Sequence, residues 1–285
     1  QQQQQQQHRR QDEMQQQQQQ HNNNTQQQNH HNQENEDPDK KTYAVDQYKF
    51  NFWRLLDLEY EISDFDPYEF IANIPPQDTL PLEHQVNTIC IPQRSIHAPK
   101  MTLVLDLDET LVHCSTQPMP NPDFVFPVVF KDTKYQVYVR RRPHFDEFLR
   151  VVAKYFEVVV FTASHQVYAD RLLNLLDKQR YISHRVFRDS CVLVDGNYLK
   201  DLCVLGRNLA HLAIIDNSPQ AFAYQIHNGI PIFSWYDDPS DTELLKMLPF
   251  LIQLSQVDDV RPVIRDKFRF FEVIHQYKRR QNPYI

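Results

Sequence analysis

The sequence lacks the features that define several large classes of protein. Its four cysteines form no C-x-x-C pair, which favours a reducing compartment over a disulfide framework. No apolar run approaches the roughly 20 residues that cross a bilayer, and the polar first residues do not resemble a signal peptide. Basic residues do not gather on one face, and the formal net charge is −7. We therefore expect a soluble intracellular protein that contacts neither membrane nor nucleic acid directly.

Two phosphate-handling motifs are also missing. None of the cysteines is followed six residues later by the arginine that a cysteine-based phosphatase requires. No G-x-x-x-x-G-K-[ST] loop is present, so chemistry on nucleoside triphosphates is not expected. Any phosphate chemistry in this chain must use other residue types.

Composition divides the chain into four parts. Residues 1–40 are rich in Gln and Asn and are predicted to be a disordered tail, because they contain little that can be buried. Residues 41–99 are predicted to form a short helix around Tyr48–Tyr60, then an extended, proline-broken segment that packs on the main domain. Residues 100–260 are the predicted catalytic domain, and residues 261–285 a C-terminal helix and tail.

Strand-like and helix-like segments alternate from residue 101 onward, which predicts an α/β fold with a doubly wound, mainly parallel sheet flanked by helices. Buried strands are expected at Met101–Leu105, Val158–Phe161, Leu212–Ile215 and Ile230–Ile232. Helices are expected from Pro143, over Gln166–Leu176, after a capping box at Ser240–Glu243, and over Asp258–Tyr277. Hairpins are expected at Val125–Val139 and Arg185–Leu199, the first a small insertion that leaves no room for a large cap domain.

Polar residues follow three of the predicted core strands. Asp106 and Asp108 follow the first, Thr162 the second, and Asp216-Asn217 the third, with Lys200 between the last two. The carboxyl ends of parallel strands meet at one edge of a sheet, where ligands bind. These groups are therefore predicted to converge.

The converging groups suit phosphoryl transfer. Asp106 is the predicted nucleophile, since a carboxylate can carry a phosphoryl group covalently. Mg²⁺ with Asp106 and Asn217 as ligands would shield the meeting anions, while Thr162 and Lys200 hold the phosphate oxygens. Asp108 is the predicted general acid and then base, with a pKa raised by the neighbouring carboxylate and phosphate.

The sequence resembles a known family along these motifs. Asp106–His113 reads DLDETLVH and Ile215–Pro219 reads IDNSP, as in FCP/SCP-type phosphatases of the haloacid dehalogenase superfamily. Within that family the similarity is greatest to the CTD small phosphatase-like protein 2 group. The resemblance implies a Mg²⁺-dependent protein serine/threonine phosphatase that acts through an aspartyl-phosphate, in the nucleus or cytoplasm. It also implies that Asp108 gives its backbone carbonyl to the metal and that Asp216 supports the site.

The resemblance further implies a substrate pocket beside the inserted hairpin, which in small family members grips a proline of the RNA polymerase II C-terminal repeat. The corresponding residues are Val128, Phe130, Val137, His165, Tyr168 and Arg188. Thr116 and His165 are polar where those members are apolar, so the polymerase repeat is only one candidate phosphoprotein substrate. A small-metabolite phosphatase and an inactive binding scaffold are the alternatives, and a monomer is expected.

Overall fold

The computed structural model describes residues 65–80 and 88–281. The predicted Gln-rich tail and the helix around Tyr48–Tyr60 lie outside the described residues. Within the described part, no helix is long and apolar enough to cross a membrane.

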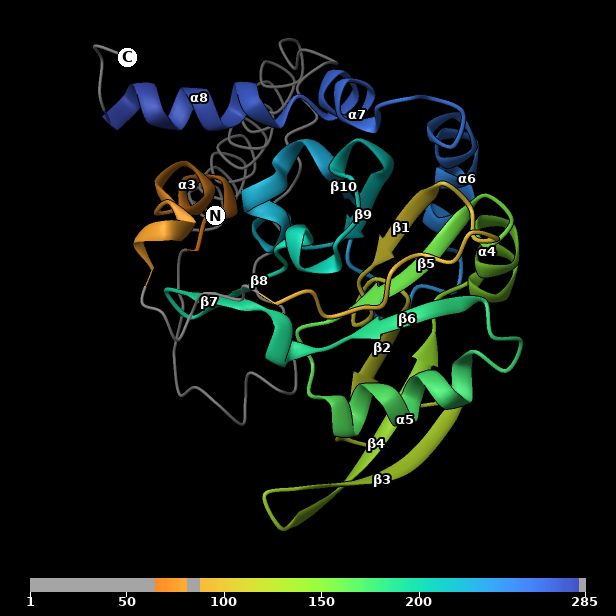
Figure 1. Ribbon diagram of the computed structural model, residues 1–285. Helices are drawn as coiled ribbons and strands as arrows, with labels where there is room; N and C mark the ends of the chain where they lie inside the picture. The colour runs from red at the N-terminus through yellow and green to blue at the C-terminus, as the bar shows by residue number, and fades with distance from the viewer. Residues whose placement is uncertain (1–64, 81–87, 282–285) are drawn as a thin grey trace, which may run out of the picture. The chain divides into compact units, whose positions relative to one another are not determined.

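The centre of the fold is a five-stranded sheet in the order β10-β9-β1-β5-β6, with every neighbouring pair parallel (Figure 1). All five residues of β1 are buried, because the strand has a neighbour on each side and helices over both faces. The strands are β1 (Met101–Leu105), β5 (Phe156–Phe161), β6 (Ile182–Val186), β9 (Leu212–Asp216) and β10 (Gly229–Pro231). The predicted doubly wound α/β fold is therefore confirmed.

Alternate residues of β1 enter two hydrophobic cores, one on each face of the sheet. Leu103 and Leu105 face the core built with α4 (Phe145–Val152), α5 (Gln166–Leu176), α6 (Glu243–Leu254) and α7 (Val260–Phe268). Val104 faces the core that contains Ile71 of α3 (Pro67–Asn73) and Phe270 of α8 (Phe270–Gln281). This alternation follows from the two-residue period of a strand.

The inserted hairpin is present and is part of a three-stranded antiparallel sheet, β2-β4-β3. The strands are β2 (Val112–Ser115), β3 (Phe124–Phe130) and β4 (Thr133–Arg141), and β3 contacts α5 (Figure 1). Sequence reasoning missed β2, a four-residue strand that begins four residues after Asp108.

The second predicted hairpin, Arg185–Leu199, is wrong in its first half. Residues Ile182–Val186 are β6 and pair in parallel with β5 in the main sheet. Only β7 (Val192–Val194) and β8 (Asn197–Leu199) form a hairpin. Asp195 and Gly196 connect them with φ of 45° and 77°, the positive values that a two-residue type I′ turn needs.

Three helix predictions also need correction. The capping box at Ser240–Glu243 is wrong, because the Ser240 hydroxyl donates to Asp238 while Asp241 accepts from the Glu243 amide. The helix predicted at Asp258–Tyr277 is two helices, broken where Arg269 adopts φ of 51°. The proline-broken segment contains α3, because Asp66 accepts hydrogen bonds from two amides of its first turn.

Candidate active site

Asp106 lies directly after β1 and is anchored on both sides. Its amide donates to the Ile215 carbonyl at 3.0 Å, which extends the contact between β1 and β9 by one residue. One carboxylate oxygen accepts from the Lys200 ammonium at 2.5 Å and the other from the Thr110 hydroxyl at 2.9 Å. The side chain is held in one orientation, yet the residue keeps 7% of its surface exposed.

Lys200 joins the ends of β1 and β9. Its ammonium contacts Asp106 and, at 2.6 Å, Asp216, while only 3% of the residue is exposed. Burial alone would lower the pKa of Lys200, but the charges of the two aspartates outweigh burial and raise it. The carboxylates of Asp106 and Asp216 thus share the single ammonium group of Lys200, so this cluster has more acidic than basic groups.

Asp108 faces a different set of partners. Its carboxylate accepts hydrogen bonds from the Ser164 hydroxyl at 2.7 Å and the Tyr168 hydroxyl at 2.7 Å. Burial raises the pKa of Asp108, and the nearby charge of Asp106 raises it further. The direction agrees with the sequence prediction, but burial is the larger cause. A raised pKa suits a group that must donate a proton near neutral pH.

Glu109 forms the sharp bend between Asp108 and Thr110. It adopts φ of 58°, a left-handed conformation that is uncommon outside glycine and asparagine. Its carbonyl accepts from the Trp235 amide at 2.8 Å, and its carboxylate lies 3.2 Å from His113. These contacts hold the bend in place, so that the loop after β1 has a fixed course.

Thr162 lies directly after β5 at the same edge of the sheet. Its amide donates to the Val186 carbonyl of β6, and its hydroxyl oxygen accepts from the Ser164 amide at 3.0 Å. The hydroxyl hydrogen is then the group that would donate to a phosphate oxygen. The same short turn supplies Ser164 to Asp108, a contact that the sequence did not predict.

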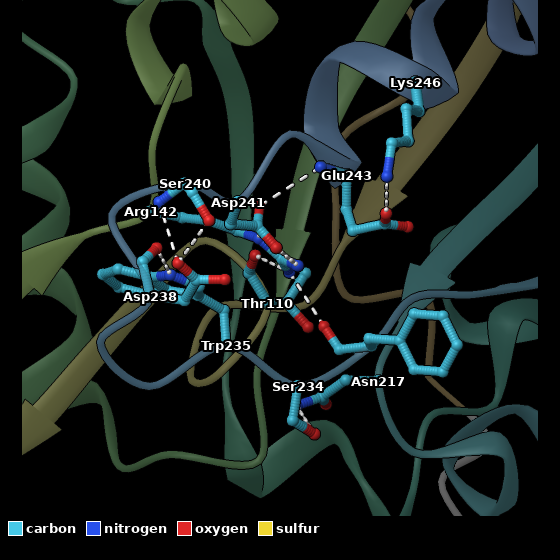
Figure 2. Close-up of polar contacts among 11 residues, drawn as sticks. Thr110, Arg142, Asn217, Ser234, Trp235, Asp238, Ser240, Asp241, Glu243 and Lys246 are labelled. Atoms are coloured by element: carbon cyan, nitrogen blue, oxygen red, sulfur yellow. Dashed lines mark hydrogen bonds and ion pairs between the residues drawn. The ribbon is translucent and has the colours of Figure 1, made fainter. Parts of the chain in front are cut away.

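Asn217 follows Asp216 and suits a magnesium ligand. Its side-chain nitrogen donates to the Ser234 hydroxyl at 3.2 Å (Figure 2), a contact that helps to orient the amide. Among the described residues no cluster of three or more His, Cys, Asp or Glu could hold a metal. Mg²⁺ is usually bound through one or two carboxylates plus waters and phosphate oxygens, so the oxygens of Asp106, Asn217 and the Asp108 backbone fit it.

Arg142 is buried and makes polar contacts with residues on two sides of the site (Figure 2). Its guanidinium makes a two-pronged ion pair with Asp241, at 2.8 and 2.7 Å, and also donates to the carbonyls of Thr110 and Phe233. It thereby connects the Asp106 loop to the segment that carries Ser234. The two members of the pair are 99 residues apart, and no local pattern in one sequence predicts such a contact.

The six predicted pocket residues divide into two groups. Val128 and Val137 lie in the core, Tyr168 is buried against Phe126 and donates to Asp108, and Arg188 is buried beneath Tyr198. Phe130 and His165 are partly exposed, and their rings lie 4.7 Å apart. Arg188 lies 3.1 Å from the His165 ring nitrogen. The pocket remains a prediction, with Phe130 and His165 as its accessible members.

The fold and the groups at the strand ends define the class of the protein: it has a haloacid dehalogenase-like fold with paired aspartates after its first core strand. The chain belongs to the NLI interacting factor-like phosphatase family, whose sequence model matches residues 101–261.

Individual relatives agree with this assignment. The chain is 53% identical to CTD small phosphatase-like protein 2 of Dictyostelium discoideum over 75% of the chain and 37% of that relative. It is 48% identical to CTD small phosphatase-like protein 3 of Caenorhabditis elegans, over 75% of the chain and 76% of the relative. It is 47% identical to the human carboxy-terminal domain RNA polymerase II polypeptide A small phosphatase 1, over 65% of the chain and 71% of the relative. The first of these relatives is thus matched over little more than a third of its length.

Proposed function

We propose that this chain is a magnesium-dependent protein serine/threonine phosphatase that acts through an aspartyl-phosphate on Asp106. The observation that carries the proposal is the setting of Asp106, fixed between Lys200 and Thr110, with Asp108 two residues further on. Family membership supports the same activity.

In the first step a carboxylate oxygen of Asp106 bonds to phosphorus as the bond to the serine or threonine oxygen breaks. Asp108, in its carboxylic acid form, gives its proton to the departing oxygen, which would otherwise leave as a poor alkoxide. In the second step the Asp108 carboxylate takes a proton from water, and the water oxygen bonds to the same phosphorus. Asp106 is released together with inorganic phosphate.

The remaining polar groups bind and orient the phosphoryl group. Lys200 neutralises charge on its oxygens, and the Thr162 hydroxyl donates to one of them. A Mg²⁺ ion, when bound by the Asp106, Asn217 and Asp108 oxygens, supplies the positive charge that lets a carboxylate approach a phosphate dianion. A second cation is expected because Lys200 alone balances the charge of only one of the two carboxylates that it contacts.

A phosphoprotein is the proposed substrate rather than a small metabolite. The segment between Asp108 and Thr162 contains β2, the β3–β4 hairpin, α4 and β5, which is too little chain for a closing cap domain. The name of the human relative supports the RNA polymerase II C-terminal domain as one candidate. An inactive scaffold would not need Asp106, Asp108 and Lys200 held by such specific contacts.

The test combines turnover with trapping of the intermediate. With Mg²⁺, the chain should hydrolyse phosphoserine peptides faster than free phosphoserine, and borohydride reduction during turnover should modify Asp106. Asp106→Asn should abolish both signals, whereas Asp266→Asn, on the exposed face of α7, should leave them unchanged. Turnover by Asp106→Asn at the rate of the unaltered protein would refute the nucleophile, and faster turnover of free phosphoserine would favour the metabolite alternative.

A further inference from the structure

Asp201, the residue after Lys200, is hydrogen-bonded to a part of the chain that lies outside the residues matched by the family model. Asp201 is 2% exposed, and its carboxylate accepts a hydrogen bond from the side-chain amide of Gln77 at 2.7 Å. Gln77 lies 124 residues earlier in the chain, while the family model begins at residue 101. The backbone beside the phosphate-binding lysine is thus fixed by an element that the family model does not cover.

Asp201 is held from a second direction by Gln225. The Gln225 side-chain nitrogen donates to Asp201 at 2.8 Å, and its oxygen accepts from the Leu202 amide at 3.0 Å. Gln225 has φ of −125° and ψ of 54°, non-helical values inside the 3-10 segment Pro219–Asn228. Gln77 and Gln225 therefore grip the Asp201 carboxylate together.

Residues 66–80, which include Gln77, are anchored to the rest of the fold by further contacts. Phe70, Ile74 and Leu80 pack on a small core formed by the β7–β8 hairpin. The Tyr224 hydroxyl donates to the Pro75 carbonyl at 3.2 Å, two residues before Gln77. The β7–β8 hairpin, which ends one residue before Lys200, is therefore covered by residues 66–80 through apolar and polar contacts.

We propose that residues 66–80 act as a clamp on the β7–β8 hairpin and on Asp201 after it, and that Gln77 is a positioning residue for Lys200. The inference rests on the proposed function. Lysine places its charge at the end of a flexible four-carbon stem, so the ammonium is located only as well as its backbone is. The Lys200 amide donates to the Ala221 carbonyl on one side, and the Asp201 carboxylate fixes the other. Small displacements of a group that holds the reacting phosphate lower rates strongly.

The test compares Gln77→Ala with Asp78→Ala, an exposed neighbour in the same short turn. The measurements are made well below the melting temperature of each variant. We expect Gln77→Ala to lower kcat/KM on a phosphopeptide about 10-fold and to weaken inhibition by inorganic phosphate by a similar factor. Hydrogen exchange of the amides at residues 197–204 should accelerate in Gln77→Ala only. Asp78→Ala should match the unaltered chain in all three measurements.

The outcomes separate this inference from the proposed function. Unchanged phosphate inhibition and unchanged exchange at residues 197–204 in Gln77→Ala would overturn the positioning role, even if the melting temperature fell. If the unaltered chain proved inactive, the phosphatase proposal would fail. Faster exchange and weaker phosphate binding in Gln77→Ala would then still support the clamp.

Discussion

The strands of the central sheet carry a buried cluster of charged groups at each end, and the two clusters differ in the number of acidic and basic groups. At the carboxyl end, Asp106 and Asp216 share the single ammonium of Lys200. At the amino end, Glu157 accepts two hydrogen bonds of 2.8 Å from Arg207. Glu157 also contacts the Thr102 hydroxyl and the His184 ring.

The difference indicates which cluster is built for a ligand. Every polar atom of the Glu157 carboxylate faces a donor within the chain, so that end has a complete set of partners and serves stability. The Lys200 cluster has more acidic than basic groups and lies beside Asp108 and Asn217. Under the proposed function, a second cation and a phosphate would complete it, whereas stability alone does not require this excess of acidic groups.

The largest expected effect is from Lys200→Met, which removes the cation at the carboxyl end. We expect kcat/KM to fall about 1,000-fold, because a phosphate oxygen loses its charged donor. The melting temperature without Mg²⁺ should also fall, since two buried carboxyl groups then face each other. Added Mg²⁺ should restore more of the melting temperature than it does in the unaltered chain; equal kcat/KM in the two proteins would contradict the role of Lys200.

Glu157→Gln tests the opposite end of the same strands. It leaves the buried Arg207 without its charged partner, so the free energy of unfolding should fall by about 3 kcal/mol in urea titrations. Glu147→Gln is the control, because Glu147 is exposed on α4. kcat should stay unchanged at temperatures where both variants are folded; a large loss of kcat in Glu157→Gln would mean that the two ends are coupled.

Ser234→Ala should give a smaller effect that is confined to the metal. Without the hydroxyl, the Asn217 amide loses one contact that orients it, and the Mg²⁺ concentration for half-maximal activity should rise about 10-fold. At saturating Mg²⁺, kcat should return to that of the unaltered chain. An unchanged Mg²⁺ requirement would show that Asn217 is oriented by other contacts or is not a ligand. Ser240→Ala, outside the Asn217 contact, is the matched control.

The smallest expected effect is on acid stability. Burial would raise the pKa of Glu157, but hydrogen bonds from Arg207 and Thr102 outweigh burial and lower it. The stabilisation from this group is therefore complete above the unfolded pKa of about 4.3 and is lost as pH falls through the lower folded value. Urea midpoints between pH 6 and pH 3 should fall less steeply for Glu157→Gln than for the unaltered chain. Parallel profiles would contradict the shift.

The sequence was most informative where local pattern and tertiary structure agree. Met101–Leu105 and Gln166–Leu176 were predicted with the observed bounds, because a buried strand and a one-sided helix have strong periodic signals. Asp106, Lys200 and Asp216 were predicted to converge because parallel strands end at one edge of a sheet, and the structure brings them into contact.

The failures occurred where long-range contacts decide the local structure. Arg185–Leu199 was predicted to be one hairpin because short strands near a turn usually pair with each other, yet its first residues belong to β6, which pairs with β5 in the main sheet. The capping-box prediction failed because Asp241, which pairs with Arg142 from another part of the chain, accepts a hydrogen bond from the Glu243 amide that Ser240 was expected to bind. Gln77 and Asp201 could not be paired from the sequence, since neither residue type nor spacing indicates a contact across 124 positions.

The bend at Glu109 has a consequence for how this loop can change. A residue held at φ of 58° stores conformational energy of order 1 kcal/mol, which glycine would release. Replacing Glu109 with glycine should therefore relax the backbone and allow Asp108 to move relative to Asp106. Glycine at this position would favour the free energy of folding, whereas a residue with a side chain keeps the bend fixed at a small cost in stability.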